Sequence, residues 1–245
     1  SAHSFGRKTL KGLSLLLSLS LLLPLAPASA ADVDAASLAA GTTSRADVLK
    51  AEAPKMQTAL LSDDVSSLKA SILVAGTADL ILPEGDTPLT LALRAESGRS
   101  VDYLLGLEDV DVTKRNRFGE SPLMLAVFKA NDKAMEAILE RGGLPNERHG
   151  WSALHYAATQ GNDEYVKKLL SLGADPNVRT NQGVTPLHMA ARLPSRNVVL
   201  TLLRAGAYRN YCTTAGLSPA DFAKKAGDEE LAKYLAIERC VKPSK

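Results

Sequence analysis

One short pattern recurs five times along this chain and constrains the fold more than any other feature. Each copy reads Gly-x-Thr/Ser-Pro/Ala-Leu/Ala, and the copies start at Gly85, Gly119, Gly150, Gly183 and Gly216. These glycines lie 34, 31, 33 and 33 residues apart. Repetition at this period is typical of an array of small stacked units rather than of one globular core. We therefore expect a chain that displays an extended surface.

Each copy also predicts where a helix begins. A Thr or Ser hydroxyl caps a helix, and a proline directly behind it suits the first helical position, which needs no backbone N–H. In the third copy we expect a short helix that carries Leu154, Ala157 and Ala158 and ends at Gly161. The spacing of apolar residues predicts a second helix carrying Tyr165, Val166, Leu169 and Leu170 and stopping at Gly173. The repeated unit is thus predicted to be helix, turn, helix and protruding turn.

These motifs resemble the ankyrin repeat family, whose units read Gly-x-Thr-Pro-Leu-His-x-Ala-Ala, then Leu-Leu, then Gly-Ala-Asp-x-Asn. The closest matches are residues 185–191 and residues 154–158, the latter followed by Leu-Leu at 169–170 and Gly-Ala-Asp-Pro-Asn at 173–177. In the first two copies we take Leu91 and Leu125 to stand at the histidine position. The resemblance covers about residues 58 to 240. It implies an all-α ankyrin-repeat solenoid with protruding hairpin turns, five repeats and a degenerate N-terminal cap.

The same register divides the chain into segments. We predict a signal peptide at 1–30, a flexible lead-in and N-terminal helix at 31–57 (with Arg45 to Leu61 able to form that helix), a degenerate capping repeat at 58–84, repeats at 85–118, 119–149, 150–182 and 183–215, and a C-terminal capping repeat and tail at 216–245.

The N-terminal residues predict export. Arg7, Lys8 and Lys11 precede an apolar run at residues 13–23, and Ala-Ser-Ala at 28–30 offers a cleavage site. Eleven helical residues span about 16 Å, against roughly 30 Å for a hydrocarbon core, so a signal peptide is favoured over a permanent membrane anchor. The expected location is the periplasm, with the extracellular space as the alternative.

Charge selects no partner class. Cleavage of the leader would remove three of the 29 basic residues and none of the 27 acidic ones. The mature chain would then carry 26 basic and 27 acidic residues, a net charge of about −1. We therefore expect no nucleic-acid partner, no integral membrane association after cleavage, and a monomer.

Cys212 and Cys240 are the two cysteines of the chain. In an exported protein they are candidates for a disulfide, because adjacent repeats can bring them together. Two unpaired thiols remain the alternative. Without a Cys-x-x-Cys motif, a redox-catalytic role is not expected.

No catalytic constellation or cofactor motif is found, so we predict neither an enzyme nor a cofactor. His155 and His188 invite a metal or acid–base interpretation, but the resemblance implies that they brace turns by hydrogen bonds. His149 has no second ligand at metal-binding spacing, so we predict no metal site. The acidic residues Glu108, Asp109 and Asp111 are interpreted as a solvated turn rather than a calcium loop.

The resemblance implies that partners dock on the concave face formed by turn tips and exposed first-helix positions. The residues predicted to bind a partner are Arg117, Phe118, Met124, Arg148, His149, Trp151, Tyr156, Val184 and Met189. The alternative is that Trp151 and Phe118 only pack between adjacent tips. Tip arginines, which also form a candidate line facing an acidic partner or a merely solvated stripe, are Arg115, Arg117, Arg148, Arg179 and Arg209.

The predicted function is a non-enzymatic protein–protein interaction module of the periplasm. Similar exported bacterial ankyrin proteins have been linked to oxidative-stress protection and to toxin immunity, and either role would fit. Two alternatives stay open: a secreted effector that binds host proteins, and an enzyme with an unrecognised site.

Overall fold

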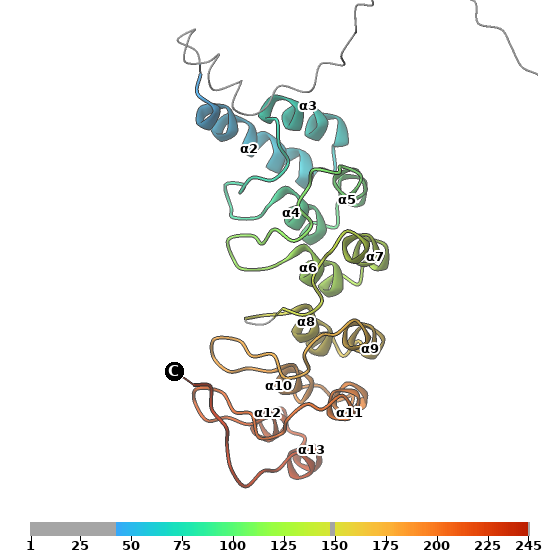
Figure 1. Cartoon of the computed structure of the whole chain (residues 1–245), viewed down its shortest axis with the longest axis vertical. Coiled ribbons are helices and arrows are strands. Elements are labelled where there is room, and N and C mark those ends of the chain that lie inside the picture. Colours follow the sequence, from blue (N-terminus) through green and yellow to red (C-terminus); the bar gives the residue numbers. More distant parts are fainter. Residues whose placement is uncertain (1–42, 148–149, 245) are drawn as a thin grey trace, which may run out of the picture. The chain divides into compact units, whose positions relative to one another are not determined.

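The computed structural model describes residues 43–147 and 150–244, which form a row of helix pairs joined by turns (Figure 1). Twelve helices and no strand are present in this part of the chain. The predicted all-α solenoid is thus confirmed. The predicted signal peptide and most of the lead-in lie outside the described residues.

The helices form two layers: the two helices of each pair pack against each other, and each inner helix packs against the inner helix of the next pair. The inner layer contains α2 (Arg45–Leu61), α4 (Pro88–Arg94), α6 (Pro122–Phe128), α8 (Ala153–Gln160), α10 (Pro186–Ala190) and α12 (Pro219–Lys225). The outer layer contains α3 (Val65–Ala75), α5 (Gly98–Leu105), α7 (Asp132–Glu140), α9 (Asp163–Ser171), α11 (Asn197–Arg204) and α13 (Glu229–Tyr234). The core between the layers consists mainly of buried Leu, Ala and Val.

The inner helices after α2 begin where the sequence predicts. The residues that cap them, each accepting a hydrogen bond from the backbone N–H three residues on, are Thr87, Ser121, Ser152, Thr185 and Ser218. Proline follows the cap in every case except Ser152. The repeated motif is therefore a helix-start signal in physical terms.

The cap bonds also correct the predicted register of the first two repeats. Thr90 and Met124 occupy the third helical position, which His155 and His188 occupy in α8 and α10. The assignment of Leu91 and Leu125 to the histidine position was wrong by one residue.

The N-terminal end of the described stack is a helix pair of its own. α2 pairs with α3, which Asp64 caps and Gly76 ends in the left-handed conformation. α2 runs without interruption across the segment boundary predicted between residues 57 and 58, and the whole of this helix belongs to the terminal pair. The Ser97 hydroxyl donates to the Leu60 carbonyl at 2.6 Å and joins this pair to the next one.

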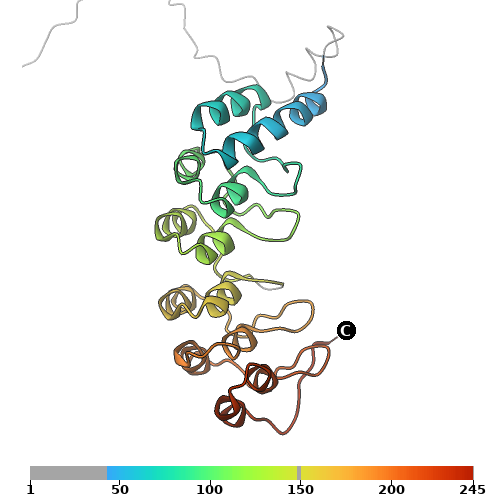
Figure 2. The ribbon, with the colours of Figure 1, turned by 180° about the vertical axis from the view of Figure 1, so that it is seen from behind.

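Long turns, here called fingers, connect each outer helix to the next inner helix and project on one side of the stack (Figure 2). The fingers comprise residues 76–87, 106–121, 141–147 with 150–152, 172–185 and 205–218. Neighbouring fingers are linked by backbone bonds, for example from Arg117 N to Gly85 O at 2.8 Å and from Thr214 N to Gln182 O at 2.9 Å.

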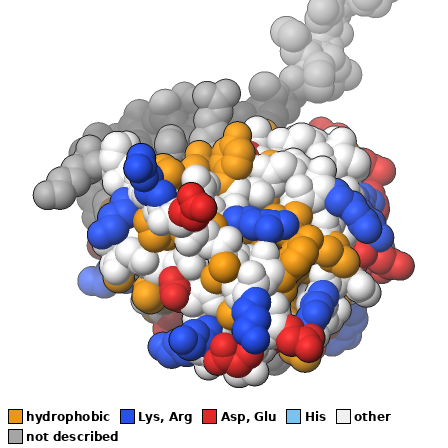
Figure 3. Space-filling view, turned by 90° about the horizontal axis from the view of Figure 1, so that it is seen from below, with side chains coloured by type: hydrophobic (Ala, Val, Ile, Leu, Met, Phe, Trp, Pro, Cys, Tyr) orange, Lys and Arg blue, Asp and Glu red, His pale blue; other side chains and the backbone are white. Residues whose placement is uncertain are grey.

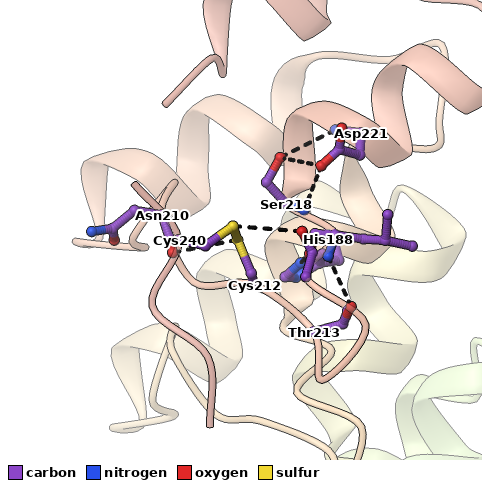
Figure 4. The surroundings of a disulfide bond; sticks show 9 residues. His188, Asn210, Cys212, Thr213, Ser218, Asp221 and Cys240 are labelled. Atoms are coloured by element: carbon purple, nitrogen blue, oxygen red, sulfur yellow. Dashed lines mark hydrogen bonds between the residues drawn. A yellow bond between two sulfur atoms is a disulfide. The ribbon is translucent and has the colours of Figure 1, made fainter. Parts of the chain in front are cut away.

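A disulfide fastens the C-terminal tail to the last finger. Cys212 and Cys240 are bonded, with their Cα atoms 5.5 Å apart (Figure 4). Val241 continues the attachment, because its carbonyl accepts from Cys212 N at 3.0 Å and its N–H donates to Asn210 O at 2.7 Å. The tail therefore closes over the end of the stack and holds the last helix pair.

Among the described residues, every helix is too short or too polar to cross a bilayer.

Candidate protein-interaction surface

The inner helices and the fingers together line one side of the stack, here called the inner face. Three positions per repeat stand toward this face: the residue before the cap, the residue after the histidine position, and the residue seven after the cap. From the second helix pair to the last these are Asp86, Leu91 and Arg94; Glu120, Leu125 and Phe128; Trp151, Tyr156 and Thr159; Val184, Met189 and Arg192; Leu217, Phe222 and Lys225. Asp86, Leu91, Leu125 and Met189 are buried, and the half-buried or exposed residues at the other positions form the surface.

Aromatic side chains gather at the middle of the inner face. The Tyr156 ring meets Phe128 edge-on at a centroid distance of 5.7 Å and Trp151 at 6.2 Å. Trp151 also contacts the His155 ring at 5.2 Å. Trp151 nevertheless leaves 40% of its surface exposed. The cluster is thus anchored on one side and open to solvent on the other, as aromatic anchors of protein interfaces are.

A network of charged and polar side chains lies beside the aromatic cluster. Arg94 bonds Asp86 at 3.1 Å and also pairs with Glu120. The Tyr156 hydroxyl donates to the other oxygen of Glu120 at 3.0 Å. Asn116 donates to both carboxylates, at 2.7 Å to Asp86 and at 2.8 Å to Glu120. These bonds join α4, α6 and α8 across three consecutive repeats.

The network keeps its groups in their ordinary charge states. Burial would raise the pKa of Glu120, but hydrogen bonds from Asn116, Arg94 and Tyr156 lower it further than burial raises it. Burial, together with the neighbouring Glu120 carboxylate, raises the pKa of the Tyr156 hydroxyl. Near neutral pH Glu120 is an anion and Tyr156 a neutral donor, so the bond between them joins a charged acceptor to a neutral hydroxyl.

His155 and His188 have the bracing role that the resemblance implied. His188 Nδ1 accepts from Thr185 N at 3.1 Å, so its Nε2 carries the proton and donates to the Leu217 carbonyl of the next finger at 3.1 Å. His155 makes the same bonds to Ser152 N at 3.2 Å and to the Val184 carbonyl at 3.0 Å. Burial lowers the pKa of each imidazole to about 4, so both are neutral near pH 7.

The residues predicted to bind a partner divide into exposed and buried ones. Phe118 is 64% exposed although its ring leans on Gly85 of the preceding finger, and Arg117 is exposed beside it. Packing between tips and exposure therefore coexist at Phe118, whereas the Trp151 ring packs on His155 and Tyr156 of its own repeat. Val184 is half-buried and packs against the core. Arg148 and His149 lie outside the described residues.

Met124 and Met189 must be corrected. Met124 is 0% exposed because it occupies the histidine position of α6, where the side chain points back to the cap at Ser121. Met189 is 7% exposed and belongs to the hydrophobic core. Neither side chain can contact a partner in this conformation.

Most of the tip arginines are occupied within the chain. Arg115 pairs with Glu147 at 2.8 Å. Arg179 stacks over the Tyr211 ring at 3.4 Å, and Arg209 covers the Tyr234 ring at 4.5 Å. At Arg115, Arg179 and Arg209 the predicted basic line thus consists of internal braces, and Arg117 is exposed.

The sequence interpretation missed Arg94 and Asp86. The sequence does contain a hint of this ion pair, because an acidic residue directly precedes the helix cap and an arginine lies seven residues after the cap. The spacing alone does not show that the two side chains meet; the stacked structure does. In the described part of the chain, no group of three or more His, Cys, Asp or Glu side chains could hold a metal ion.

A row of helix pairs with fingers and an exposed aromatic cluster defines a class: helical repeat proteins that present a surface. The family model for ankyrin repeats in three copies matches residues 89–180, 130–214 and 154–244, which together exceed half of the chain. This chain belongs to the ankyrin repeat family, and its repeats form a protein-interaction module.

A bacterial ankyrin repeat domain of known structure is similar to this chain. The crystal structure of an ankyrin repeat domain from Acinetobacter baumannii AYE is 30% identical, covers 74% of this chain and 95% of its own, and superposes with a TM-score of 0.58. No curated protein sequence matches the chain.

Proposed function

We propose that this chain is a non-enzymatic periplasmic module that binds a protein partner on the middle of its inner face. The observation that carries the proposal is the exposed aromatic pair Trp151 and Phe118, on consecutive fingers beside the Arg94–Glu120 network. Aromatic side chains supported by packed neighbours and flanked by charged groups are the usual centres of protein interfaces.

The packing around Trp151 supports this assignment. Its ring is held by Tyr156 and His155, and both of those side chains are themselves fixed by hydrogen bonds. A large side chain that is already ordered loses little conformational entropy when a partner covers it. Such an anchor contributes more to affinity than an equally exposed but mobile side chain.

The periplasmic location rests on the leader motif at residues 1–30. Fractionation of cells that express the full chain, followed by mass determination of the mature protein, tests it. We expect a mature chain that begins at Ala31 in the periplasmic fraction. An uncleaved chain in the cytoplasm would refute the location and leave the binding proposal standing.

Capture of partners from periplasmic extract tests the binding surface. We compare the wild type with a Phe118→Ala, Trp151→Ala variant and expect the affinity for the captured partner to fall at least about tenfold. The matched control is Leu73→Ala with Val74→Ala, which truncates two exposed apolar side chains of the outer helix α3, outside the inner face. Equal recovery of every partner by wild type and the aromatic variant would remove the proposed surface.

A further inference from the structure

An open hollow of about 940 Å³ lies at the C-terminal end of the inner face. It is bordered by Arg192, which follows α10, and by the residues Leu217, Asp221, Phe222, Lys224 and Lys225 in and before α12. Figure 3 looks at this end of the stack and shows Lys and Arg side chains lying among apolar and acidic ones. A hollow of this size accommodates several side chains of a bound segment.

The charge of the hollow is unbalanced. Arg192, Lys224 and Lys225 are exposed, and none of them forms an ion pair within the described residues. The acidic side chain of Asp221 is committed elsewhere, because it accepts from Ser218 N at 2.7 Å and from the Ser218 hydroxyl at 2.8 Å. Three cations therefore face solvent around one engaged carboxylate, whereas the arginines of the fingers are mostly paired or stacked.

The floor of the hollow is apolar and rigid. Leu217 is 44% exposed, and the half-buried Phe222 ring rests edge-on against His188 at a centroid distance of 4.9 Å. His188 is fixed in turn by Thr185 and by the Leu217 carbonyl. An apolar floor ringed by free cations complements a ligand that carries both a large apolar group and negative charge.

We propose that this hollow binds an acidic segment of a protein partner and receives an aromatic or aliphatic side chain that lies between acidic residues. This inference deepens the proposed function by giving the C-terminal end of the inner face its own partner chemistry. A peptide is favoured over a nucleic acid because the cations surround an apolar floor at one place, and the mature chain is close to neutral overall. Phosphate backbones are bound by a basic patch or stripe that follows the strand, whereas the three cations here stand together around one hollow.

Fluorescence anisotropy with the mature chain and a labelled synthetic peptide tests the proposal. The probe is a short peptide of Asp and Glu with one central Phe. Lys224→Glu with Lys225→Glu is expected to weaken its binding by about tenfold or more, and rising salt is expected to weaken binding to the wild type. The control variant, Lys50→Glu with Lys233→Glu, changes the net charge equally at two exposed lysines outside the hollow and is expected to bind like the wild type.

Two further probes separate apolar contact from charge alone. Replacing the central Phe of the peptide by Ala is expected to weaken binding, and an unlabelled DNA oligonucleotide is expected not to displace the peptide. The proposal is overturned if the Lys224 and Lys225 variant binds like the wild type, if the control variant loses as much affinity, if the Ala peptide binds equally, or if the oligonucleotide competes. Thermal unfolding of both variants shows that any loss is not a loss of fold.

The test also distinguishes this inference from the broader proposal. The Phe118→Ala, Trp151→Ala variant should keep its affinity for the acidic peptide while losing the partner captured from extract. Failure of peptide binding with intact capture rejects the hollow alone, and intact peptide binding with unaltered capture by the aromatic variant rejects the central surface alone.

Discussion

His155 and His188 show how a single residue type couples neighbouring repeats. Each ring receives a bond from its own helix cap and donates one to the carbonyl at the base of the next finger. Because burial lowers both pKa values to about 4, folding requires the neutral rings. Protonation would place a charge in the core and remove the acceptor at Nδ1.

This predicts a stability that depends on pH. The unfolded chain binds a proton near pH 6.5 and the folded chain only near pH 4, so the stabilisation is complete above 6.5 and is lost as pH falls toward 4. Between pH 7 and pH 5.5 we expect a loss of about 1 kcal/mol per histidine, measured by urea unfolding. A His188→Gln variant should lose less over this interval than the wild type. The same pH dependence in both proteins would contradict the assignment.

For single residues, the sequence predicted the role of the two histidines better than it predicted the burial and the contacts of other side chains. The bracing role of the histidines was implied by the resemblance to ankyrin repeats. The burial of Met124 was not, because its position relative to the cap depends on which backbone N–H the Ser121 hydroxyl accepts. The ion pairs of Arg94 likewise require side chains from two repeats whose distance no spacing reveals.

The fingers are the elements whose geometry tolerates least change. Gly183 and Gly119 hold equivalent places in their repeats and share a φ of +79°. A Cβ at Gly183 would lie 3.0 Å from the Cys212 carbonyl oxygen and 2.7 Å from Pro243 Cγ in the tail, whereas a Cβ at Gly119 would meet nothing within 4 Å. The pair separates backbone strain from steric conflict.

We therefore predict different costs for the same substitution. Gly119→Ala should destabilise by about 1 kcal/mol through the positive φ alone, and Gly183→Ala by about 1–3 kcal/mol more because finger and tail must move apart. Chemical denaturation of the two variants measures the difference. If both substitutions lowered the free energy of unfolding equally, the tail would have to move away from the Gly183 finger at no energetic cost.

The helices and fingers were predictable because their signals are local. A cap, a proline and an apolar stripe each act within one repeat. Which side chains meet between two repeats depends on how the repeats stack. The sequence therefore does not reveal that Arg192, Lys224 and Lys225 border one hollow, because this follows from the packing of α10 against α12.

In the molecule as a whole, the ends of the stack differ from its middle. An internal helix pair has two neighbours, whereas α12 and α13 have one. The disulfide spans 28 residues and encloses both of these helices. On the loop-entropy estimate it stabilises them by roughly 3.5 kcal/mol.

Reduction should accordingly act at one end. We expect hydrogen exchange of α12 and α13 amides to accelerate strongly on reduction, while α6 and α8 keep their protection. A Cys212→Ser, Cys240→Ser variant should behave like the reduced chain without reductant. Faster exchange along the entire stack would show that its ends and middle unfold as one unit.

The Asp86, Arg94, Glu120 and Tyr156 network has a consequence for how the surface meets other molecules. Because its bonds tie three successive helix pairs together, those repeats cannot rotate against one another without separating buried charges. The curvature of the central repeats is therefore set before an encounter occurs. A partner whose shape does not fit this surface would have to change its own conformation in order to bind. The free energy of that change would therefore distinguish one partner from another.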